Sequence, residues 1–157
     1  MVYFQQGRQA EAEAQWRAAV AERPDFLAGW LGLAEGHVRQ ERWGELEGIL
    51  RRLEGMPPHG PMEATLFRAR AHLARRECAS ARDLLEGMIA RHPQALEPRV
   101  ALSHVFLQEG QDLAAAERAL RDVLALAPQH GEAQHNLAIL LQQRERSNEA
   151  AVVVEVR

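Results

Sequence analysis

The stretch AEAQWRAAVAERPDF, residues 12–26, has the pattern of a short helix that ends at a proline. Alanines and Trp16 recur at helical spacing as far as Pro24, whose missing backbone N–H is typical of a helix end. A helix of this length is only marginally stable alone in water. We therefore expect Trp16 to pack on a neighbouring helix, with Pro24 turning the chain into that layer.

The same segment recurs three more times along the chain. The prolines at its end are 34, 35 and 35 residues apart: Pro24, Pro58, Pro93 and Pro128. Small or apolar residues stand twelve, eight and five positions before each proline, which places them on one stripe of a helix. They are Ala12, Leu46, Ala81 and Ala116; Trp16, Leu50, Leu85 and Leu120; and Ala19, Leu53, Met88 and Val123.

Another helical pattern precedes each later copy, so each repeat unit has a first and a second helix. The first helices carry Trp30, Leu33, Ala34 and His37; Thr65, Arg68, Ala69 and His72; Leu102, Ser103 and Phe106; and Leu137, Ala138 and Leu141. We expect helices at 9–22, 27–40, 43–55, 62–75, 79–91, 96–109, 112–126, 132–144 and 147–155, with residues 1–6 ending an earlier helix. The small residues Ala34, Ala69, Ala81, Ala116 and Ala138 are expected to let paired helices approach closely.

This pattern resembles the tetratricopeptide repeat, a helix–turn–helix unit of 34 residues. The matching residues are Tyr3, Gly7, Ala12, Trp16, Ala19 and Pro24 in one partial unit, and Trp30, Leu33, Ala34, Leu46, Leu50 and Pro58 in a whole one. The resemblance implies an all-α, right-handed superhelical solenoid of antiparallel helix pairs. A single solenoid would cover residues 1–157, with units 1–26 (partial), 27–60, 61–95, 96–130 and 131–157 (partial). We also expect a slice of a longer bacterial array, in which Trp16 packs on Tyr3 and, mainly, near Trp30 and Leu33.

Composition excludes several classes of protein. The formal net charge is −3, and all 19 basic residues are arginines, so the basic excess typical of nucleic-acid binders is missing. The run of apolar residues needed to cross a membrane is also missing, as is a signal peptide. Cys78 is the only cysteine, which rules out a disulfide within the chain and permits a reducing, cytoplasmic location.

Chemistry at a catalytic or metal centre is not predicted. The sequence has no glycine-rich phosphate loop, no nucleophile elbow and no zinc-binding His-Glu-x-x-His pattern, so we expect no catalytic residue, no cofactor and no metal. His37 and His72 fall where the repeat family has tyrosine, and are interpreted as filling space between helices. His130 and His135 match no ligand spacing, and Cys78 has no activating partner in sequence.

Function is therefore expected on a surface. In tetratricopeptide proteins the first helices line a concave groove, and the resemblance assigns inward positions to Leu31, Glu35, Val38 and Arg39; Leu66, Arg70 and Leu73; Val100, His104, Leu107 and Gln108; and His135, Ile139 and Gln142. This mixed strip suits an extended or helical peptide. Arg39, Arg70 and His104 are the candidates for meeting acidic groups, and the alternative is that they are ordinary solvated residues.

The leading hypothesis is a non-catalytic scaffold that binds a protein or peptide and neither nucleic acid nor membrane. One alternative is an arm of a larger enzyme, such as a glycosyltransferase or methyltransferase, that guides substrate or assembly. Another is RNA binding, because pentatricopeptide repeats share the helix-pair design. Solenoids normally need polar capping helices, and neither end shows one, so self-association through the repeat ends is also expected.

Overall fold

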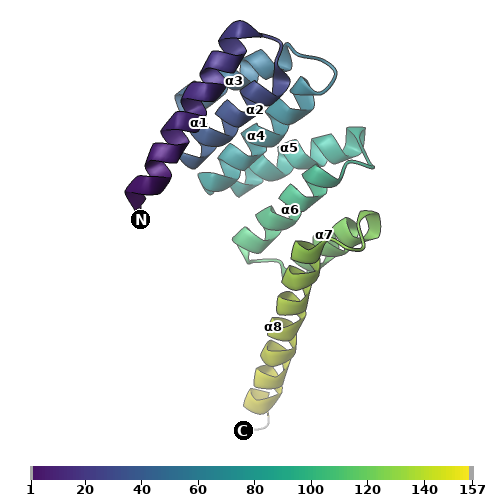
Figure 1. Cartoon of the computed structure of the whole chain (residues 1–157). Coiled ribbons are helices and arrows are strands. Elements are labelled where there is room, and N and C mark those ends of the chain that lie inside the picture. The colour runs from purple at the N-terminus through teal and green to yellow at the C-terminus, as the bar shows by residue number, and fades with distance from the viewer. Residues whose placement is uncertain (1, 156–157) are drawn as a thin grey trace. The chain divides into compact units, whose positions relative to one another are not determined.

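The computed structural model describes the backbone of residues 2–155 and the side chains of residues 8–145. This part of the chain is all-helical and contains no strand. The helices in order are α1 (Val2–Glu22), α2 (Leu27–Arg39), α3 (Trp43–Glu54), α4 (Gly60–Ala74), α5 (Cys78–Arg91), α6 (Leu96–Glu109), α7 (Leu113–Leu126) and α8 (Gly131–Glu155) (Figure 1). The expected all-α class is confirmed.

The six internal helices begin and end within two residues of their predicted bounds, whereas the two terminal predictions were wrong. A turn was expected near Gly7, but α1 is continuous from Val2 to Glu22. A break was expected before Ser147, but α8 is continuous as far as Glu155. Glycine inside a helix costs only about 1 kcal/mol, and neither segment contains a proline, so nothing in the local sequence forces the chain to turn.

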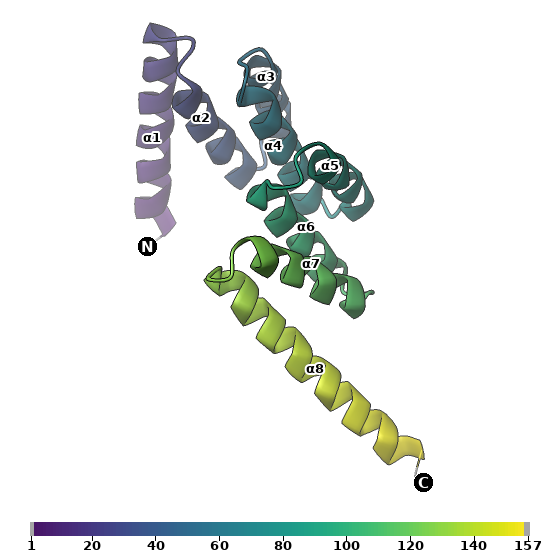
Figure 2. The ribbon, with the colours of Figure 1, turned by 90° about the vertical axis from the view of Figure 1, so that its right-hand side faces the viewer.

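The chain divides into two compact units, Met1–Ala81 and Arg82–Arg157, with the boundary inside α5. In the first unit α1 packs on α2, α2 on α3, and α3 on α4 (Figure 2). Helix α2 also contacts α4, so two helices that are not consecutive meet within this unit. In the second unit α6 packs on α7, and α7 packs on α8.

The core of the first unit confirms the packing role of Trp16. The half-buried indole of Trp16 packs against the cluster that contains Leu33 of α2. Its ring lies so close to Gly32 that a Cβ added there would come within 2.5 Å of it. Trp16 therefore packs on the next helix as expected, while the expected contact with Tyr3 lies outside the described side chains.

The small residues expected between paired helices are buried in four of five cases. Ala34, Ala69, Ala81 and Ala116 are buried, whereas Ala138 of α8 is exposed, so that prediction was wrong at one position. The expected partner of Ala138 was a last helix that folds back over it. Because α8 continues straight through that segment, the described residues provide no such cover.

Two turn features repeat along the chain. The turn that follows each of α2, α4 and α6 contains one residue in the left-handed region: Glu41 (φ 56°), Arg76 (φ 60°) and Gly110 (φ 65°). In addition, three different side chains donate a hydrogen bond to the carbonyl of the proline six residues earlier. They are Trp30 to Pro24 (2.9 Å), Arg99 to Pro93 (2.9 Å) and Gln134 to Pro128 (2.7 Å). Each bond ties the start of a first helix to the proline that ended the previous helix.

Candidate functional site

The predicted inward residues of the first unit lie on α2 and α4, which pack against each other. Glu35 of α2 lies between two arginines. Its Oε2 is 2.8 Å from Nη1 of Arg70 on α4, and its Oε1 accepts a hydrogen bond from Nε of Arg39 at 3.1 Å. The hydrogen bond from Arg70 holds the pKa of the Glu35 carboxyl below its ordinary value, against the opposing effect of burial. Glu35 is therefore ionised at neutral pH and partly neutralises both arginines.

The apolar residues predicted for this face differ in how much of each is accessible. Leu31, Val38 and Leu73 are half-buried and leave part of each side chain for contact. Leu66 is buried at 8% exposure, so it supports the face from below and offers little surface. The guanidinium of Arg70 also lies 5.1 Å from the ring centroid of Phe67, which fixes its position further.

The predicted inward residues of the second unit lie on α6 and α8. Val100 and Leu107 pack against the core cluster formed by α7 and α8. Nε2 of His104 is 3.1 Å from Oε1 of Glu132, so a polar contact joins α6 to α8. The remaining members, Gln108, His135, Ile139 and Gln142, are exposed. Among the side chains that the structure describes, Ile139 stands out as an exposed large hydrophobic residue, at 42% exposure.

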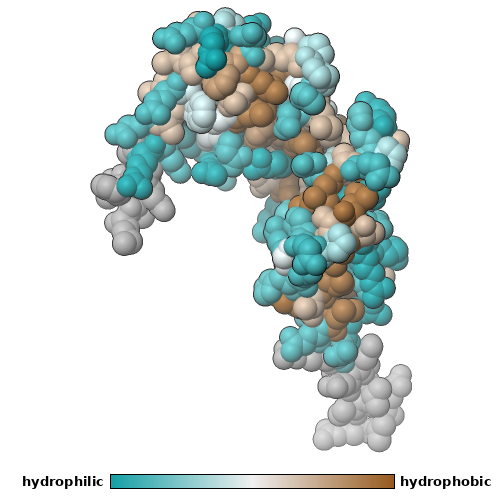
Figure 3. All heavy atoms as spheres, turned by 45° about the vertical axis from the view of Figure 1, so that its right-hand side comes forward, coloured by the Kyte–Doolittle hydropathy of each residue, from teal (hydrophilic) through white to brown (hydrophobic). Residues whose placement is uncertain are grey.

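In both units the charged groups expected to meet a ligand already have partners within the chain. Arg39 and Arg70 share Glu35, and His104 is next to Glu132. An acidic ligand group at these positions would have to compete with a carboxylate that is already in place. Figure 3 shows hydrophobic side chains that reach the surface between hydrophilic ones. On the face of the first unit, half-buried Leu31, Val38 and Leu73 offer apolar contact without that competition.

The arginine-rich stretch 68–76 is not an open basic patch. Arg68 donates to Glu47 at 2.8 Å and to Glu54 at 2.9 Å, which explains how an arginine is tolerated where other units have leucine. These carboxylates raise the pKa of Arg68, although burial acts to lower it. Arg75 pairs with Glu77 at 2.7 Å. Together with the Arg70–Glu35 contact, three of the four arginines of this stretch therefore have a carboxylate partner, on α2, on α3 or in the turn before α5.

The histidines predicted to fill space are indeed enclosed. His37 is buried, and burial together with Arg42 lowers its pKa. His72 is half-buried, with Nδ1 2.6 Å from Oε2 of Glu77. His130 has a role that spacing did not indicate, because its Nδ1 accepts a hydrogen bond from the backbone N–H of Ala133 at 3.2 Å, near the start of α8. Cys78 is half-buried and free.

A repeated ion pair at one position of the second helices was not predicted from the sequence. Glu13, Glu47, Arg82 and Glu117 follow one another at the repeat spacing of 34 or 35 residues. Each binds an oppositely charged residue of a later helix or turn: Arg42, Arg68, Glu109 and Arg144. In the last two pairs, Arg82–Glu109 and Glu117–Arg144, equivalent positions carry opposite charges. Recurrence of charged residues at the repeat period was the signal that could have revealed them.

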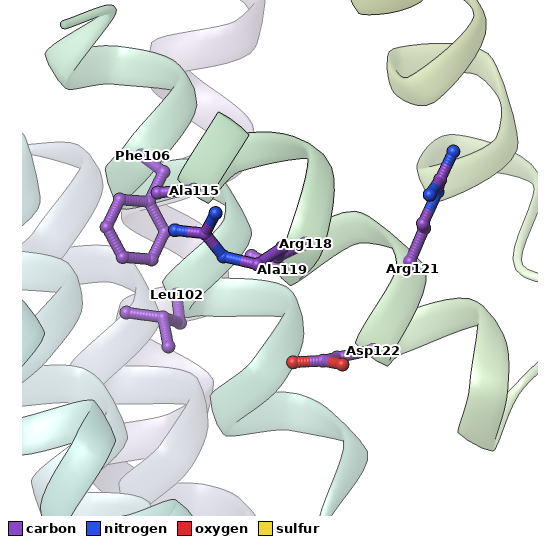
Figure 4. Close-up of a pocket in the computed structure, with 7 residues that line it drawn as sticks. All are labelled: Leu102, Phe106, Ala115, Arg118, Ala119, Arg121 and Asp122. Carbon is purple, nitrogen blue, oxygen red and sulfur yellow. The ribbon is translucent and has the colours of Figure 1, made fainter. Parts of the chain in front are cut away.

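Two open hollows lie away from the predicted faces. One, of about 400 Å³, lies on the second unit, where Leu102 and Phe106 of α6 meet Ala115 and Ala119 of α7. Figure 4 shows the Arg118 guanidinium directed toward Phe106, with Arg121 pointing away. The other, of about 370 Å³, lies on the first unit among the loops around Pro24 and Pro58, beside Arg52. Both hollows could admit a side chain.

Comparisons with known proteins do not assign a family. No protein-family model and no curated protein sequence matches the chain. Over the described residues, no helix combines the length and hydropathy needed to cross a membrane. In the same part of the chain, no group of three or more histidine, cysteine or acidic side chains is placed to hold a metal ion.

Proposed function

We propose that the chain is a tetratricopeptide-like scaffold that binds a peptide segment of another protein across its first helices. The observation that carries this proposal is the Glu35–Arg70 contact, because it joins equivalent positions on successive first helices. The proline-carbonyl bonds, the left-handed turn residues and the ion pairs of the second helices recur at the same period. These recurrences support a chain built from like helix pairs. Within the first unit, the neighbouring first helices α2 and α4 contact each other and form the proposed surface.

The α2–α4 face defines the chemistry of the peptide. Half-exposed Leu31, Val38 and Leu73 favour apolar side chains at intervals along the ligand. Glu35 between Arg39 and Arg70 leaves one net positive charge among these three groups, so an acidic residue beside the apolar ones would add affinity by displacing Glu35 from an arginine. The proposed ligand is thus an apolar peptide segment with an acidic residue.

Selection from a random displayed peptide library on the immobilised protein tests the proposal. Selected peptides should be apolar with an acidic residue, and the double variant Val38→Ser, Leu73→Ser should bind them at least about tenfold more weakly in fluorescence anisotropy. Ala125→Ser is the control, because Ala125 is exposed on α7, the second helix of its repeat unit, and this variant should keep full affinity. Circular dichroism melting establishes that each variant is folded.

Glu35→Gln provides a second variant that is expected to fold normally. It removes the internal competitor, so acidic peptides should bind several-fold more tightly while neutral ones are unchanged. Failure of the library to yield any binder, or binders whose affinity is the same for all variants, would overturn the proposal.

A further inference from the structure

The hollow between α6 and α7 of the second unit has an apolar floor and a charged rim. Its volume is about 400 Å³, and its floor is formed by Leu102, Phe106, Ala115 and Ala119. The rim is formed by three side chains of α7: Arg118, Arg121 and Asp122. Pockets that bind small molecules span about 300–1,000 Å³ and are mostly apolar with a few polar groups. The hollow therefore has the size and the make-up of a small-molecule site.

The two large side chains of the floor keep part of their apolar surface accessible. Leu102 and Phe106 are equivalent to Leu33 and His37 of α2, which are both buried. On α6 the equivalent side chains are only half-buried. The guanidinium of Arg82 lies 5.3 Å from the ring centroid of Phe106, and it already has its own ion pair. The rest of the floor is left for an apolar group that enters the hollow.

Arg118 is the rim cation that is free to bind an anion. Arg121 contacts Glu117 at 2.8 Å, and Asp122 is 3.8 Å from Arg99. Over the part of the chain that the structure describes, Arg118 has no hydrogen-bond or ion-pair partner. Figure 4 shows the Asp122 carboxylate lying apart from the Arg118 guanidinium. A carboxylate that binds Arg118 would displace no internal partner.

The packing of the helix pairs does not require a cation at this position. The residues equivalent to Arg118 are Gly48 on α3 and Asp83 on α5, and all three positions are exposed. An unpaired guanidinium beside an apolar floor complements an anion that is attached to an apolar body. Such a ligand gains a charge-assisted hydrogen bond and buries apolar surface in the same hollow.

We propose that this hollow binds a small organic acid, with its carboxylate on Arg118 and an aromatic or branched apolar body over Phe106 and Leu102. The apolar floor consists of four side chains within a charged rim. That area is far smaller than the roughly 800 Å² per partner of a stable protein interface, so a free acid fits the hollow better than a docked protein. The site uses neither α2 nor α4, so this proposal and the proposed function can each fail alone.

The experiment is an NMR titration of the whole chain with naphthalene-2-carboxylate, and with naphthalene-2-carboxamide as its neutral match. The acid should shift the methyl resonances of Leu102, Ala115 and Ala119, with a Kd below about 1 mM. The amide keeps the apolar body but lacks the charge, so it should bind about tenfold more weakly.

Two variants of the rim test the role of Arg118. Arg118→Gln should weaken binding of the acid at least about tenfold and leave binding of the amide unchanged. Arg121→Gln is the matched control, because it makes the same change on the same rim at a residue that Glu117 already engages. Its affinity for the acid should stay within about twofold of the unmodified chain. Circular dichroism melting establishes that both variants are folded.

A peptide arm distinguishes a free acid from a segment of a partner protein. The acetylated and amidated peptide Ala-Phe-Asp-Ala carries an aromatic ring and a carboxylate on a peptide chain, and it should bind more weakly than the naphthoate. Tighter binding of this peptide at the floor would overturn the proposal in favour of a protein partner. Absence of shifts at the floor, equal affinity for the acid and the amide, or equal weakening by Arg118→Gln and Arg121→Gln would also overturn it.

Discussion

Glu35 and Arg70 are 35 residues apart in sequence, and a contact of 2.8 Å joins their side chains across α2 and α4. Residues one repeat apart therefore carry opposite charges on neighbouring helices. The pair is partly exposed, so its electrostatic energy is screened by solvent. Its value lies in fixing how α2 and α4 face each other as much as in stability.

A double-mutant cycle on this pair should give a small coupling that depends on pH. Glu35→Gln, Arg70→Gln and the double variant should yield about 0.2–1 kcal/mol of coupling in the free energy of unfolding at neutral pH. Arg70 holds the pKa of Glu35 below its ordinary value of 4.5, so the contribution is complete above that value. It is lost as the pH falls through the lower pKa of the folded state. Urea unfolding at neutral and at acid pH measures the coupling energy and its loss in acid. Equal coupling at the two pH values would contradict the conclusion that Arg70 stabilises the ionised form of Glu35.

Burial of His37 should make the protein less stable in mild acid. The pKa of His37 is lowered in the folded state, so below its ordinary value of 6.5 the unfolded chain binds the proton more readily. The free energy of unfolding should therefore fall by at most about 1.4 kcal/mol per pH unit, until folded His37 itself is protonated. His37→Gln removes this dependence, whereas the same change at exposed His59 should not. Parallel stability–pH curves for His37→Gln and the unmodified protein would show that the prediction is wrong.

Arg76 carries backbone strain that glycine would relieve. Its φ of 60° costs a residue with a Cβ roughly 1 kcal/mol, and the equivalent turn after α6 has Gly110 at a φ of 65°. Arg76→Gly should stabilise the protein by about 0.5–1 kcal/mol, and Gly110→Ala should destabilise it by a similar amount. Denaturant midpoints measured at fixed pH show whether each variant is more or less stable than the unmodified protein. If both variants change stability in the same direction, the left-handed backbone at these turns is not the cause.

Gly32 and Gly48 should respond oppositely to the same substitution. A Cβ at Gly32 would lie 2.5 Å from the Trp16 ring, while a Cβ at Gly48 of α3 meets nothing within 4 Å. Gly48→Ala should gain up to about 1 kcal/mol from helix propensity. At Gly32 the clash outweighs that gain, and Gly32→Ala should cost about 1–3 kcal/mol. Thermal unfolding distinguishes them, and stabilisation by both changes would mean that Trp16 does not pack on α2.

Arg82 and Glu109 should tolerate exchange of their charges. The equivalent pair one repeat later, Glu117 with Arg144, already has the reversed order. Arg82→Glu alone should cost roughly 1–3 kcal/mol. Adding Glu109→Arg should restore most of the stability that Arg82→Glu loses. The double variant should remain about 0.5–1 kcal/mol less stable than the unmodified protein, because the stacking of Arg82 over Phe106 is lost. If the double variant is no more stable than the single one, the ion pair contributes nothing to packing.

The sequence was sufficient to predict the internal helices but not the terminal ones. Pro24, Pro58, Pro93 and Pro128 act locally, so helix ends near them could be read from residue type alone. Whether α8 folds back near Ser147 depends on tertiary contacts that a short polar stretch does not encode. For this reason the exposure of Ala138 was not foreseen.

The sequence predicted which helices carry the candidate residues, but it did not predict the ion pairs that these residues form. Repeat register placed Glu35, Arg39 and Arg70 on neighbouring first helices, and α2 and α4 do meet. Register alone could not show that Glu35 bridges both arginines, because that depends on side-chain rotamers and on the distance between helices. It also could not show that Leu66 is buried beneath the face.

Amide chemical-shift mapping with a library-selected peptide tests the proposed binding face most directly. Titration should shift the resonances of α2 and α4, centred on Val38, Arg70 and Leu73, and leave α3 largely unchanged. Glu35→Gln should preserve that map while tightening binding of an acidic peptide. Shifts centred on α1 and α3, or no shifts at saturating peptide, would contradict peptide binding on the first helices.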